Sequence, residues 1–332
     1  MLYTGTARTV TKVDNPARSE IDKTKRPATG TALAERLEGL SKGHPSEQGY
    51  FDAPEQHRPL TDGEHAERVA DVKARLEKAR AAGLSTDRLH TIDPEREVWS
   101  KERRSEHDAI VEELYARASS VPCERKAIMA GGLPGAGKTT VLTEHAHIDR
   151  SRYLMINPDL IKEELARRNL IPQVDDLSPM EASDLVHEES SHLAKRLARR
   201  AEAAGKNLIW DVTMSSVAST ERRVESLRGA GYVEVEAIFV DIPIEVSIRR
   251  ADSRHREDHD EFRAGRGIGG RLIPGETILD HADAQWGSQN RKCFEQLKSR
   301  FDCWSIYDNS VDGRAPVLAE SSSTDLAEEP TK

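Results

Sequence analysis

The stretch "GGLPGAGKTT", residues 131–140, decides the fold. It fits the pattern G-x-x-x-x-G-K-[ST], with Gly132, Gly137, Lys138 and Thr139 at the fixed positions. An apolar run, "KAIMA", precedes it, and a segment with helical character, "TTVLTEHA", follows it. A strand, a glycine-rich turn and a helix in this order are the context in which the pattern forms a phosphate-binding loop.

A triphosphate needs many hydrogen-bond donors within a small space. Glycines let the backbone bend so that successive N–H groups point inward, and the N-terminus of the following helix adds positive potential. Lys138 can then reach the β- and γ-phosphates, and the Thr139 hydroxyl can bind Mg²⁺. The alternative is an ordinary glycine-rich turn between a strand and a helix. The residues predicted to bind ATP are Gly132, Leu133, Pro134, Gly135, Ala136, Gly137, Lys138, Thr139 and Thr140.

The composition limits the classes of protein to consider. Of the 332 residues, 36% are hydrophobic and 32% are charged, which is more polar than a typical compact domain, so part of the chain is expected outside a core. The net charge of −9 argues against a chain-wide affinity for nucleic acid or an anionic membrane, although a local basic cleft is compatible with it. No apolar run has membrane-spanning length, and the N-terminus does not resemble a signal peptide. Three cysteines without metal-binding spacing predict free thiols in a reducing cytoplasm.

The segments on either side of the main domain differ from it in character. Residues 1–59 are rich in polar residues, Pro and Gly, and we expect them to be disordered or weakly structured. Residues 60–122 form a predicted helical region, because apolar residues recur at helical spacing in 60–83 and again in 100–119. Residues 319–332 are polar and acidic and are expected to form a disordered tail.

Strands and helices alternate through residues 123–318. Ser178, Pro179 and Glu181 fit the start of a long helix that ends at Gly205, with a capping box and a first-turn proline. Such alternation predicts a parallel sheet covered by helices. The expected strands are the apolar runs at 126–132, 153–159, 207–213, 235–242 and 304–309.

The type of phosphate-loop protein follows from what the sequence lacks. A GTPase needs a guanine-reading "NKxD" segment, which is missing, and a motor ATPase ends an apolar strand in Asp-Glu, where this chain has Asp211-Val212. Kinases of small molecules or nucleic acids remain. The sequence therefore predicts an α/β P-loop kinase with a parallel five-stranded sheet flanked by helices, plus an N-terminal helical extension.

A kinase also needs a base for the acceptor hydroxyl and cations for the transferring phosphoryl group. Asp159, in "MINPDLIK", follows the second strand, where an acceptor would lie, and is the predicted base. An acidic residue in the first turn of a helix is also common for helix-dipole reasons. Residues 247–274 combine many arginines with four glycines and predict a phosphate-binding lid, or alternatively a solvated charged helix and a flexible loop.

The phosphate loop, "INPDLIK", "NLIWDVT" and "GGRLIPGETI" occur in one order along residues 126–309, and in this the chain resembles the zeta toxin family. These are P-loop kinases that phosphorylate UDP-N-acetylglucosamine and pair with an antitoxin. The resemblance implies ATP or GTP with Mg²⁺ at the loop, and Asp159 as the base that deprotonates the sugar hydroxyl. It further implies contact with the sugar nucleotide or the metal shell by Asp211 and Thr213, and phosphate stabilisation by Arg254 and Arg271.

The chain departs from the family pattern in the sugar half of the site. The family often has Glu-Gly-Thr where this chain has Asp211-Val212-Thr213, and its arginine after the threonine is replaced by Met214-Ser215-Ser216. A carboxylate expected on the preceding helix is replaced by Lys195, and the nearest substitutes are Glu188 and Glu189, which are equally compatible with a solvated helix face. The acceptor is therefore left open.

Three functions of different classes follow. The first is an ATP-dependent phosphotransferase acting on a hydroxyl of a nucleotide sugar such as UDP-N-acetylglucosamine, restrained by an antitoxin or by its own N-terminal region covering the cleft. The second is a P-loop kinase for another small molecule or for a polynucleotide end, and the net acidity disfavours the polynucleotide. The third is an interaction protein controlled by a nucleotide. Residues 60–120 are alternatively a simple extension.

Overall fold

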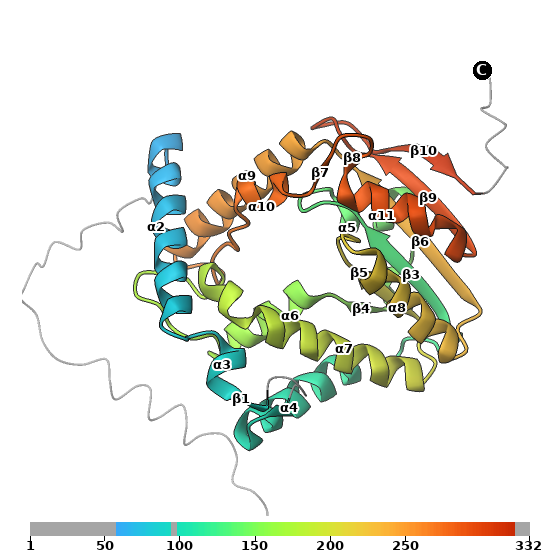
Figure 1. Cartoon of the computed structure of the whole chain (residues 1–332), viewed down its shortest axis with the longest axis horizontal. Helices are drawn as coiled ribbons and strands as arrows, with labels where there is room; N and C mark the ends of the chain where they lie inside the picture. Colours follow the sequence, from blue (N-terminus) through green and yellow to red (C-terminus); the bar gives the residue numbers. More distant parts are fainter. Residues whose placement is uncertain (1–57, 94–97, 323–332) are drawn as a thin grey trace, which may run out of the picture. The chain divides into compact units, whose positions relative to one another are not determined.

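A six-stranded sheet organises the part of the chain that the computed structural model describes, residues 58–93 and 98–322 (Figure 1). These residues belong to one unit, Gln56–Lys332, and the predictions for residues 1–57 and 323–332 lie outside them. The strands, in spatial order, are β10 (Val317–Ser321), β9 (Cys303–Asp308), β6 (Glu234–Asp241), β3 (Lys126–Gly131), β5 (Leu208–Asp211) and β4 (Leu154–Ile156).

The five strands from β9 to β4 pair in parallel, which confirms the predicted parallel sheet. β10 adds a sixth strand that runs antiparallel to β9. Residues 319–321, predicted to lie in a disordered tail, belong to this strand instead. A polar, alternating segment can form an edge strand because pairing satisfies the backbone groups that β9 would otherwise expose.

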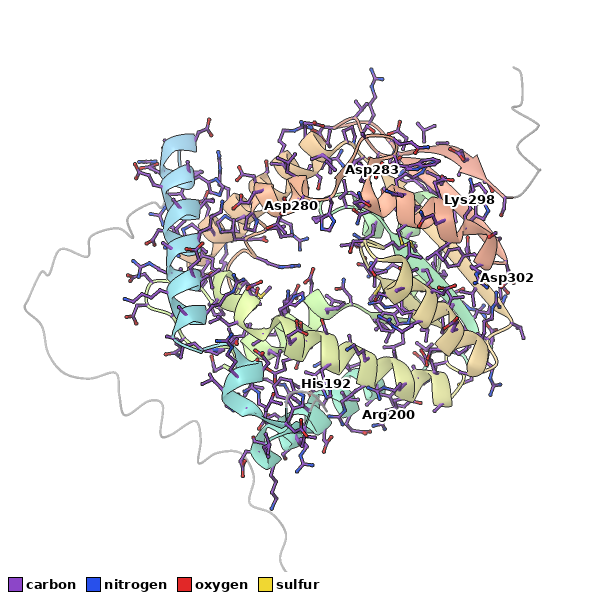
Figure 2. The ribbon with its side chains drawn as sticks, viewed as in Figure 1. His192, Arg200, Asp280, Asp283, Lys298 and Asp302 are labelled. Carbon is purple, nitrogen blue, oxygen red and sulfur yellow. The ribbon has the colours of Figure 1, made fainter. Side chains whose placement is uncertain are left out.

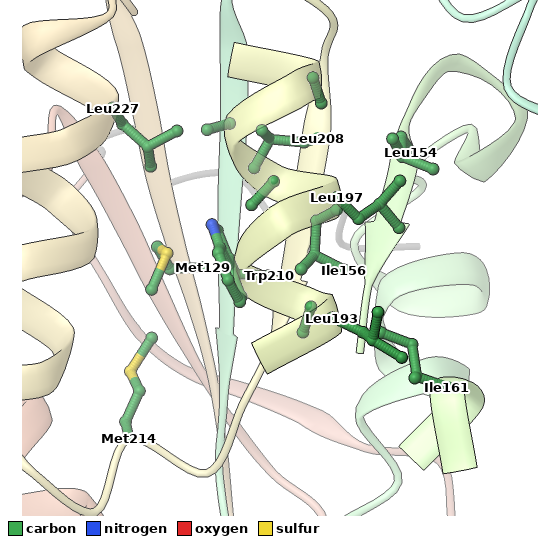
Figure 3. Packing of buried hydrophobic residues seen from close by; sticks show 14 of the residues in the cluster. Met129, Leu154, Ile156, Ile161, Leu193, Leu197, Leu208, Trp210, Met214 and Leu227 are labelled. Carbon is green, nitrogen blue, oxygen red and sulfur yellow. The ribbon is translucent and has the colours of Figure 1, made fainter. Parts of the chain in front are cut away.

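Helices cover both faces of the sheet. α7 (His187–Ala203), α8 (Val217–Gly229) and α11 (Gln289–Leu297) cover one face, and α9 (Ile244–Arg263) with the π-helix η1 (Val141–His145) covers the other. On the first face, Leu193 and Leu197 of α7 lie against Trp210 of β5 (Figure 3). The remaining elements of this region are α5 (Lys138–Thr140), η2 (Arg150–Arg152), α6 (Pro158–Arg167), η3 (Glu181–Val186), α10 (Gly275–Leu279), β7 (Ala282–Asp283), β8 (Gly287–Ser288) and η4 (Lys298–Arg300).

The long helix predicted from residue 178 begins differently from the expectation. Its capping box is present, because the Ser178 N–H donates to Glu181 at 2.8 Å and the Glu181 N–H donates to the Ser178 hydroxyl at 3.3 Å. The segment first forms the 3₁₀ helix η3, and α7 starts only at His187. Val186, the last residue of η3, has φ −112° and ψ 21°, and this non-helical conformation marks the change to α7.

The predicted helical region before the sheet contains α2 (Asp62–Ala81), α3 (Thr86–His90) and α4 (Lys101–Arg117), with a small pair of strands, β1 (Thr91–Asp93) and β2 (Val98–Trp99). α4 packs on α7, and its Ile110 and Val111 belong to the main core. Arg200 and His192 both extend from α7 on the side of α4 (Figure 2), and the Arg200 guanidinium lies 4.3 Å from the Tyr115 ring centroid. α4 is therefore an integral layer of the same folded unit as the sheet.

α2 connects parts of the unit that are far apart in sequence. Its Arg68 donates through Nε to the buried Glu181 carboxylate at 2.8 Å. His65 contacts His255 of α9, with 2.9 Å between Nε2 and Nδ1, and Lys73 contacts Glu276 of α10 at 2.7 Å. One helix thus links α9 and α10 to the start of η3.

Replacing Arg68 by Met tests this link. The Glu181 side chain is fully buried and that of Arg68 is 17% exposed, so the substitution leaves a buried carboxylate without its guanidinium. We expect the free energy of unfolding to fall by about 3 kcal/mol in urea titrations. Arg80→Met is the matched control, because Arg80 pairs with Asp184 at the surface and its loss should cost about 0–1 kcal/mol. Equal, small effects of the two substitutions would contradict the prediction.

Candidate active site

The phosphate loop leaves β3 where no side chain fits. Gly132 has φ +135°, and a Cβ at this position would lie 2.3 Å from the carbonyl oxygen of Val240 in β6. Gly137 has φ +83°, and a Cβ there would lie 2.5 Å from Nδ2 of Asn309. Conformation favours glycine at both positions, and at Gly132 the backbone oxygen of Val240 also leaves no space for a side chain. The glycine pattern in the sequence therefore reflects close packing as well as the turn.

Side chains from other elements hold the loop from outside. The Ser247 hydroxyl donates to the carbonyl of Pro134 at 2.7 Å, and Arg250 donates to that of Gly135 at 3.3 Å. Asn309, just after β9, donates to the carbonyl of Ala136 at 2.7 Å. Three successive carbonyls are thus bonded, which fixes the loop before a nucleotide binds. Sequence reasoning missed these three residues, and no local motif marks them.

Lys138 is tied to the neighbouring strand. Its Nζ lies 3.6 Å from Oδ1 of Asp211, at the end of β5, and 3.4 Å from the carbonyl oxygen of Gly132. Asp211 also accepts a hydrogen bond from Nδ2 of Asn157 at 2.9 Å. Asn157 caps α6 by accepting from the N–H of Asp159 at 2.8 Å. A continuous set of polar contacts therefore joins the loop lysine to the residue predicted as the base.

Asp159 lies half-buried between two cations. Arg271, from the segment between α9 and α10, donates to Oδ2 at 2.5 Å, and the Nζ of Lys162 lies 3.4 Å from Oδ1. Burial by itself would raise the pKa of Asp159, but Arg271 and then Lys162 outweigh it, so the pKa is held below its ordinary value. The carboxylate is ionised at neutral pH and able to accept a proton.

Lys162 is a feature of this cluster that the sequence reasoning missed. Its side chain is 1% exposed, which is rare for lysine, and burial together with Arg271 lowers its pKa to about 8. His187, at the start of α7, also has a lowered pKa, first because of burial and then because of Lys162. The segment "INPDLIK" contains Lys162, but nothing in the sequence indicates that this lysine points inward.

The loop after β5 is held beside the phosphate loop. The carbonyl of Thr213 accepts from Nδ2 of the buried Asn290 at 2.7 Å and from the N–H of Gly132 at 3.4 Å. The Thr213 side chain itself is exposed and contacts Ser215. Met214 is buried with φ +55°, a conformation that non-glycine residues seldom adopt, and it fills the space beside Gly131. Thr213, a predicted substrate residue, therefore lies with Lys138 at the carboxyl-terminal end of the parallel strands.

Three other predicted site residues lie apart from this cluster. Arg254 is 78% exposed and faces Asp258 of its own helix at 3.7 Å. Glu188 is exposed and lines a hollow of about 300 Å³ with Arg80 and His187. Glu189 is fully buried, and its carboxylate accepts from Arg103 of α4 at 2.6 Å, with His107 also at 2.6 Å. Its position ties α4 to α7, and both of its oxygens are engaged there.

The residues around the loop fit Mg²⁺. The Thr139 hydroxyl is exposed at the start of α5, and the Asp211 carboxylate lies beside Lys138. Within residues 58–93 and 98–322, no three His, Cys, Asp or Glu side chains converge on a point that could hold a metal ion. Mg²⁺ usually keeps several waters and takes one or two protein ligands together with phosphate oxygens. The donor set therefore suits an ion bound mainly by the nucleotide.

Replacing Asn309 by Ala tests the outer support of the loop. The substitution removes the amide that donates to Ala136, and we expect ATP to bind about fivefold to tenfold more weakly because about 1 kcal/mol of loop preorganisation is lost. Isothermal titration calorimetry with MgATP measures this change. Ser310→Ala is the control, since Ser310 hydrogen-bonds only Asp308 among the described residues. Unchanged affinity in Asn309→Ala would show that the loop needs no such support.

Comparisons with known proteins identify the family that this chain resembles. The family model described as "Zeta toxin" matches residues 113–311, more than half of the chain. No curated protein matches the chain. Among the solved structures, the AvrRxo1-ORF1:AvrRxo1-ORF2 complex with sulphate ions has a TM-score of 0.55 and 18% identity, covering 71% of this chain and 76% of that chain. The same complex with ATP has a TM-score of 0.51 and 19% identity, covering 67% and 68%.

A structure from the PezAT chromosomal toxin–antitoxin system of Streptococcus pneumoniae has a TM-score of 0.48 and 19% identity, covering 66% of this chain and 80% of that chain. At these identities the two AvrRxo1 complexes establish similarity of fold alone, and they confirm the predicted α/β architecture. The assignment rests on the family match, which spans both the phosphate loop and the segment that carries Arg271. This chain therefore belongs to the zeta toxin family, whose members' kinase chemistry supports an ATP-dependent phosphotransferase activity.

Proposed function

We propose that this protein transfers the γ-phosphate of ATP to a hydroxyl of a nucleotide sugar such as UDP-N-acetylglucosamine. One observation carries the proposal: polar contacts run without a gap from Lys138 through Asp211 and Asn157 to Asp159, with distances of 3.6, 2.9 and 2.8 Å. This arrangement supports a phosphate-binding lysine and a proton acceptor on one sheet edge, as direct transfer requires.

The reaction needs little from the protein beyond positioning and charge. The acceptor hydroxyl gives its proton to Asp159 while its oxygen forms a bond to the γ-phosphorus. The bond from that phosphorus to the β–γ bridging oxygen breaks, and ADP leaves with the electron pair. Lys138 and Arg271 stabilise the negative charge on the phosphoryl oxygens, and Mg²⁺, when bound at Thr139, neutralises further phosphate charge.

The ionised state of Asp159 suits a loose transition state. Its lowered pKa makes it a weak base in the resting protein, so it takes the proton only when the new bond to phosphorus has acidified the hydroxyl. Arg271 donates a hydrogen bond to Oδ2, so its departure would leave that oxygen free to accept the proton of the hydroxyl. Movement of Arg271 toward the phosphates would remove one cation and make Asp159 a better base.

The acceptor side is the finer part of the proposal. Asp211 and Thr213 lie at the sheet edge beside the loop, which supports contact with the acceptor, and the exposed Glu188 remains a candidate. Arg254 lies one helical turn beyond Arg250, which touches the loop, and this place on α9 supports a role in stabilising the phosphates. The preference for UDP-N-acetylglucosamine rests on the family resemblance alone.

An antitoxin partner and a cytoplasmic location complete the proposal. Structures of a complex of AvrRxo1-ORF1 with AvrRxo1-ORF2 support a protein partner by analogy. Cys123, Cys293 and Cys303 are free thiols, as a reducing compartment would keep them. In the described part of the chain, no helix has the length and apolar character needed to cross a membrane.

Restraint by the N-terminal region is a second element, favoured by the contacts of α2. This helix holds α9 and α10, which flank the segment of Arg271, and it holds Glu181 on the other side. Such bridging would limit movement of Arg271 and of α9, and so act in cis without covering the phosphate loop itself.

The base assignment has a direct test. Asp159→Asn should reduce transfer from γ-labelled ATP by at least about 100-fold while leaving MgATP affinity nearly unchanged. Lys138→Ala should lower both binding and transfer, since its ammonium contacts the phosphates. The assay offers a panel of UDP-sugars and detects the phosphorylated product by mass spectrometry. Wild-type rates in Asp159→Asn would remove Asp159 from the mechanism, and a wild-type protein that modifies no panel member would exclude those acceptors.

Restraint by α2 is tested by cutting its surface links. Asp62 pairs with Arg256 of α9 and Lys73 with Glu276 of α10, and both links are exposed enough that their loss should cost about 0–1 kcal/mol of stability each. Asp62→Asn/Lys73→Met should raise turnover severalfold if α2 holds α9 and α10 back. Arg80→Met, which cuts a link to Asp184 instead, serves as the control. Unchanged turnover in a stably folded double variant would argue for a purely structural α2.

A further inference from the structure

Lys162 stands out among the charged groups of the kinase unit. It is one of the largest fully buried side chains, although its ammonium group would be strongly hydrated in water. Within the described residues, the ion-pair partner of this ammonium is Asp159, one turn earlier in α6, with 3.4 Å between Nζ and Oδ1. Burying an ammonium group costs free energy, and the ion pair with its partner has to offset that cost.

Asp159 receives one cation on each oxygen, and the two cations differ in how they are held. Lys162 belongs to the same helix as Asp159 and is enclosed by the core. Arg271 comes from the irregular segment between α9 and α10, and its side chain is 31% exposed. Of the two, Arg271 is the one that can turn away to bind a phosphate, and Lys162 is the one that stays.

We propose that Lys162 is a positioning residue for phosphoryl transfer, holding Asp159 in place through Oδ1 while Arg271 leaves Oδ2 for the phosphoryl group and the acceptor hydroxyl takes its place. This inference rests on the proposed function. The proton moves from the hydroxyl to Oδ2, and Lys162 keeps its own proton throughout. Without Lys162, departure of Arg271 would leave the carboxylate free to rotate and without either of its two ion-pair partners.

The charged groups around Asp159 define what the pH dependence should report. Arg271, Lys162 and Lys138 all lower the pKa of Asp159, and His187 lies near the same cluster. Arg271 remains charged throughout the accessible pH range. Removing the charge of Lys162 therefore raises the pKa of Asp159, and the acid limb of the kcat–pH profile moves to higher pH with it.

The test compares Lys162→Met and Lys162→Arg with the wild type. In Lys162→Met we expect the acid limb of kcat to move up by about one pH unit and kcat at neutral pH to fall about tenfold or more, with the dissociation constant of MgATP unchanged. Lys162→Arg should restore the acid limb. In the free protein, where Arg271 lies beside Lys162, the pKa of Lys162 near 8 also predicts a decline of wild-type kcat/KM above that pH, which Lys162→Arg should lack because arginine keeps its charge.

A second readout needs no acceptor. Carbon-13 NMR of protein labelled at the aspartate carboxyl follows the titration of Asp159, whose signal is identified by its loss in Asp159→Asn. We expect the pKa of Asp159 to rise by about one unit in Lys162→Met. If the wild type phosphorylates no hydroxyl compound, the proposed function fails, and this titration alone decides whether Lys162 controls Asp159.

Lys206→Met is the matched control for loss of a buried lysine. Lys206 is buried too, but it precedes β5, at the opposite end of that strand from Asp211, and it donates to the carbonyls of Ala118 and Val121. It should leave both the pH profile and the Asp159 titration unchanged. Should Lys162→Met not fold, Lys162→Gln replaces it. A folded Lys162→Met or Lys162→Gln with wild-type kcat, acid limb and Asp159 titration would overturn the inference.

Discussion

The close approach of Gly132 to Val240 is the constraint on which the site depends. Because a Cβ at position 132 would lie 2.3 Å from a carbonyl oxygen of β6, only glycine fits where the chain leaves β3. The loop then turns at the edge of the sheet and sets Lys138 beside Asp211 at the end of β5. Asp211 in turn holds Asn157, which caps the helix of Asp159. Polar contacts thus connect the loop that begins at Gly132 to Asp159, the proposed base.

The charged groups around Asp159 form a cluster at the carboxyl-terminal end of the parallel sheet. A carboxylate, two cations and a histidine with a lowered pKa gather at the N-termini of α6 and α7. Each group changes the protonation of its neighbours, so the cluster has properties that none of the residues has alone. Loss of any one charge would alter the others, which makes this cluster sensitive to the arrival of a triphosphate.

The N-terminal helices take part in the kinase unit at two places. α4 supplies Ile110 and Val111 to the main core and pairs Arg103 with Glu189 of α7. α2 joins α9 and α10 to η3 through His65, Lys73 and Arg68. The contacts of α4 stabilise the core. The contacts of α2 lie beside the segment that carries Arg271, and Leu272 of that segment packs against the apolar cluster that contains Val72 and Leu76 of α2.

The sequence by itself determined the phosphate loop, the five parallel strands and the capping box at Ser178, because each depends on residues close together in the chain and on repeating patterns. Only the tertiary structure decided that Lys162 points inward, that Asn309 supports the loop from 173 residues away, and that Glu189 is engaged by α4. It also added β10, whose pairing depends on a free edge of β9 rather than on its own composition. Local propensity and motif spacing depend on neighbouring residues, whereas burial and pairing depend on which distant segments the fold brings together.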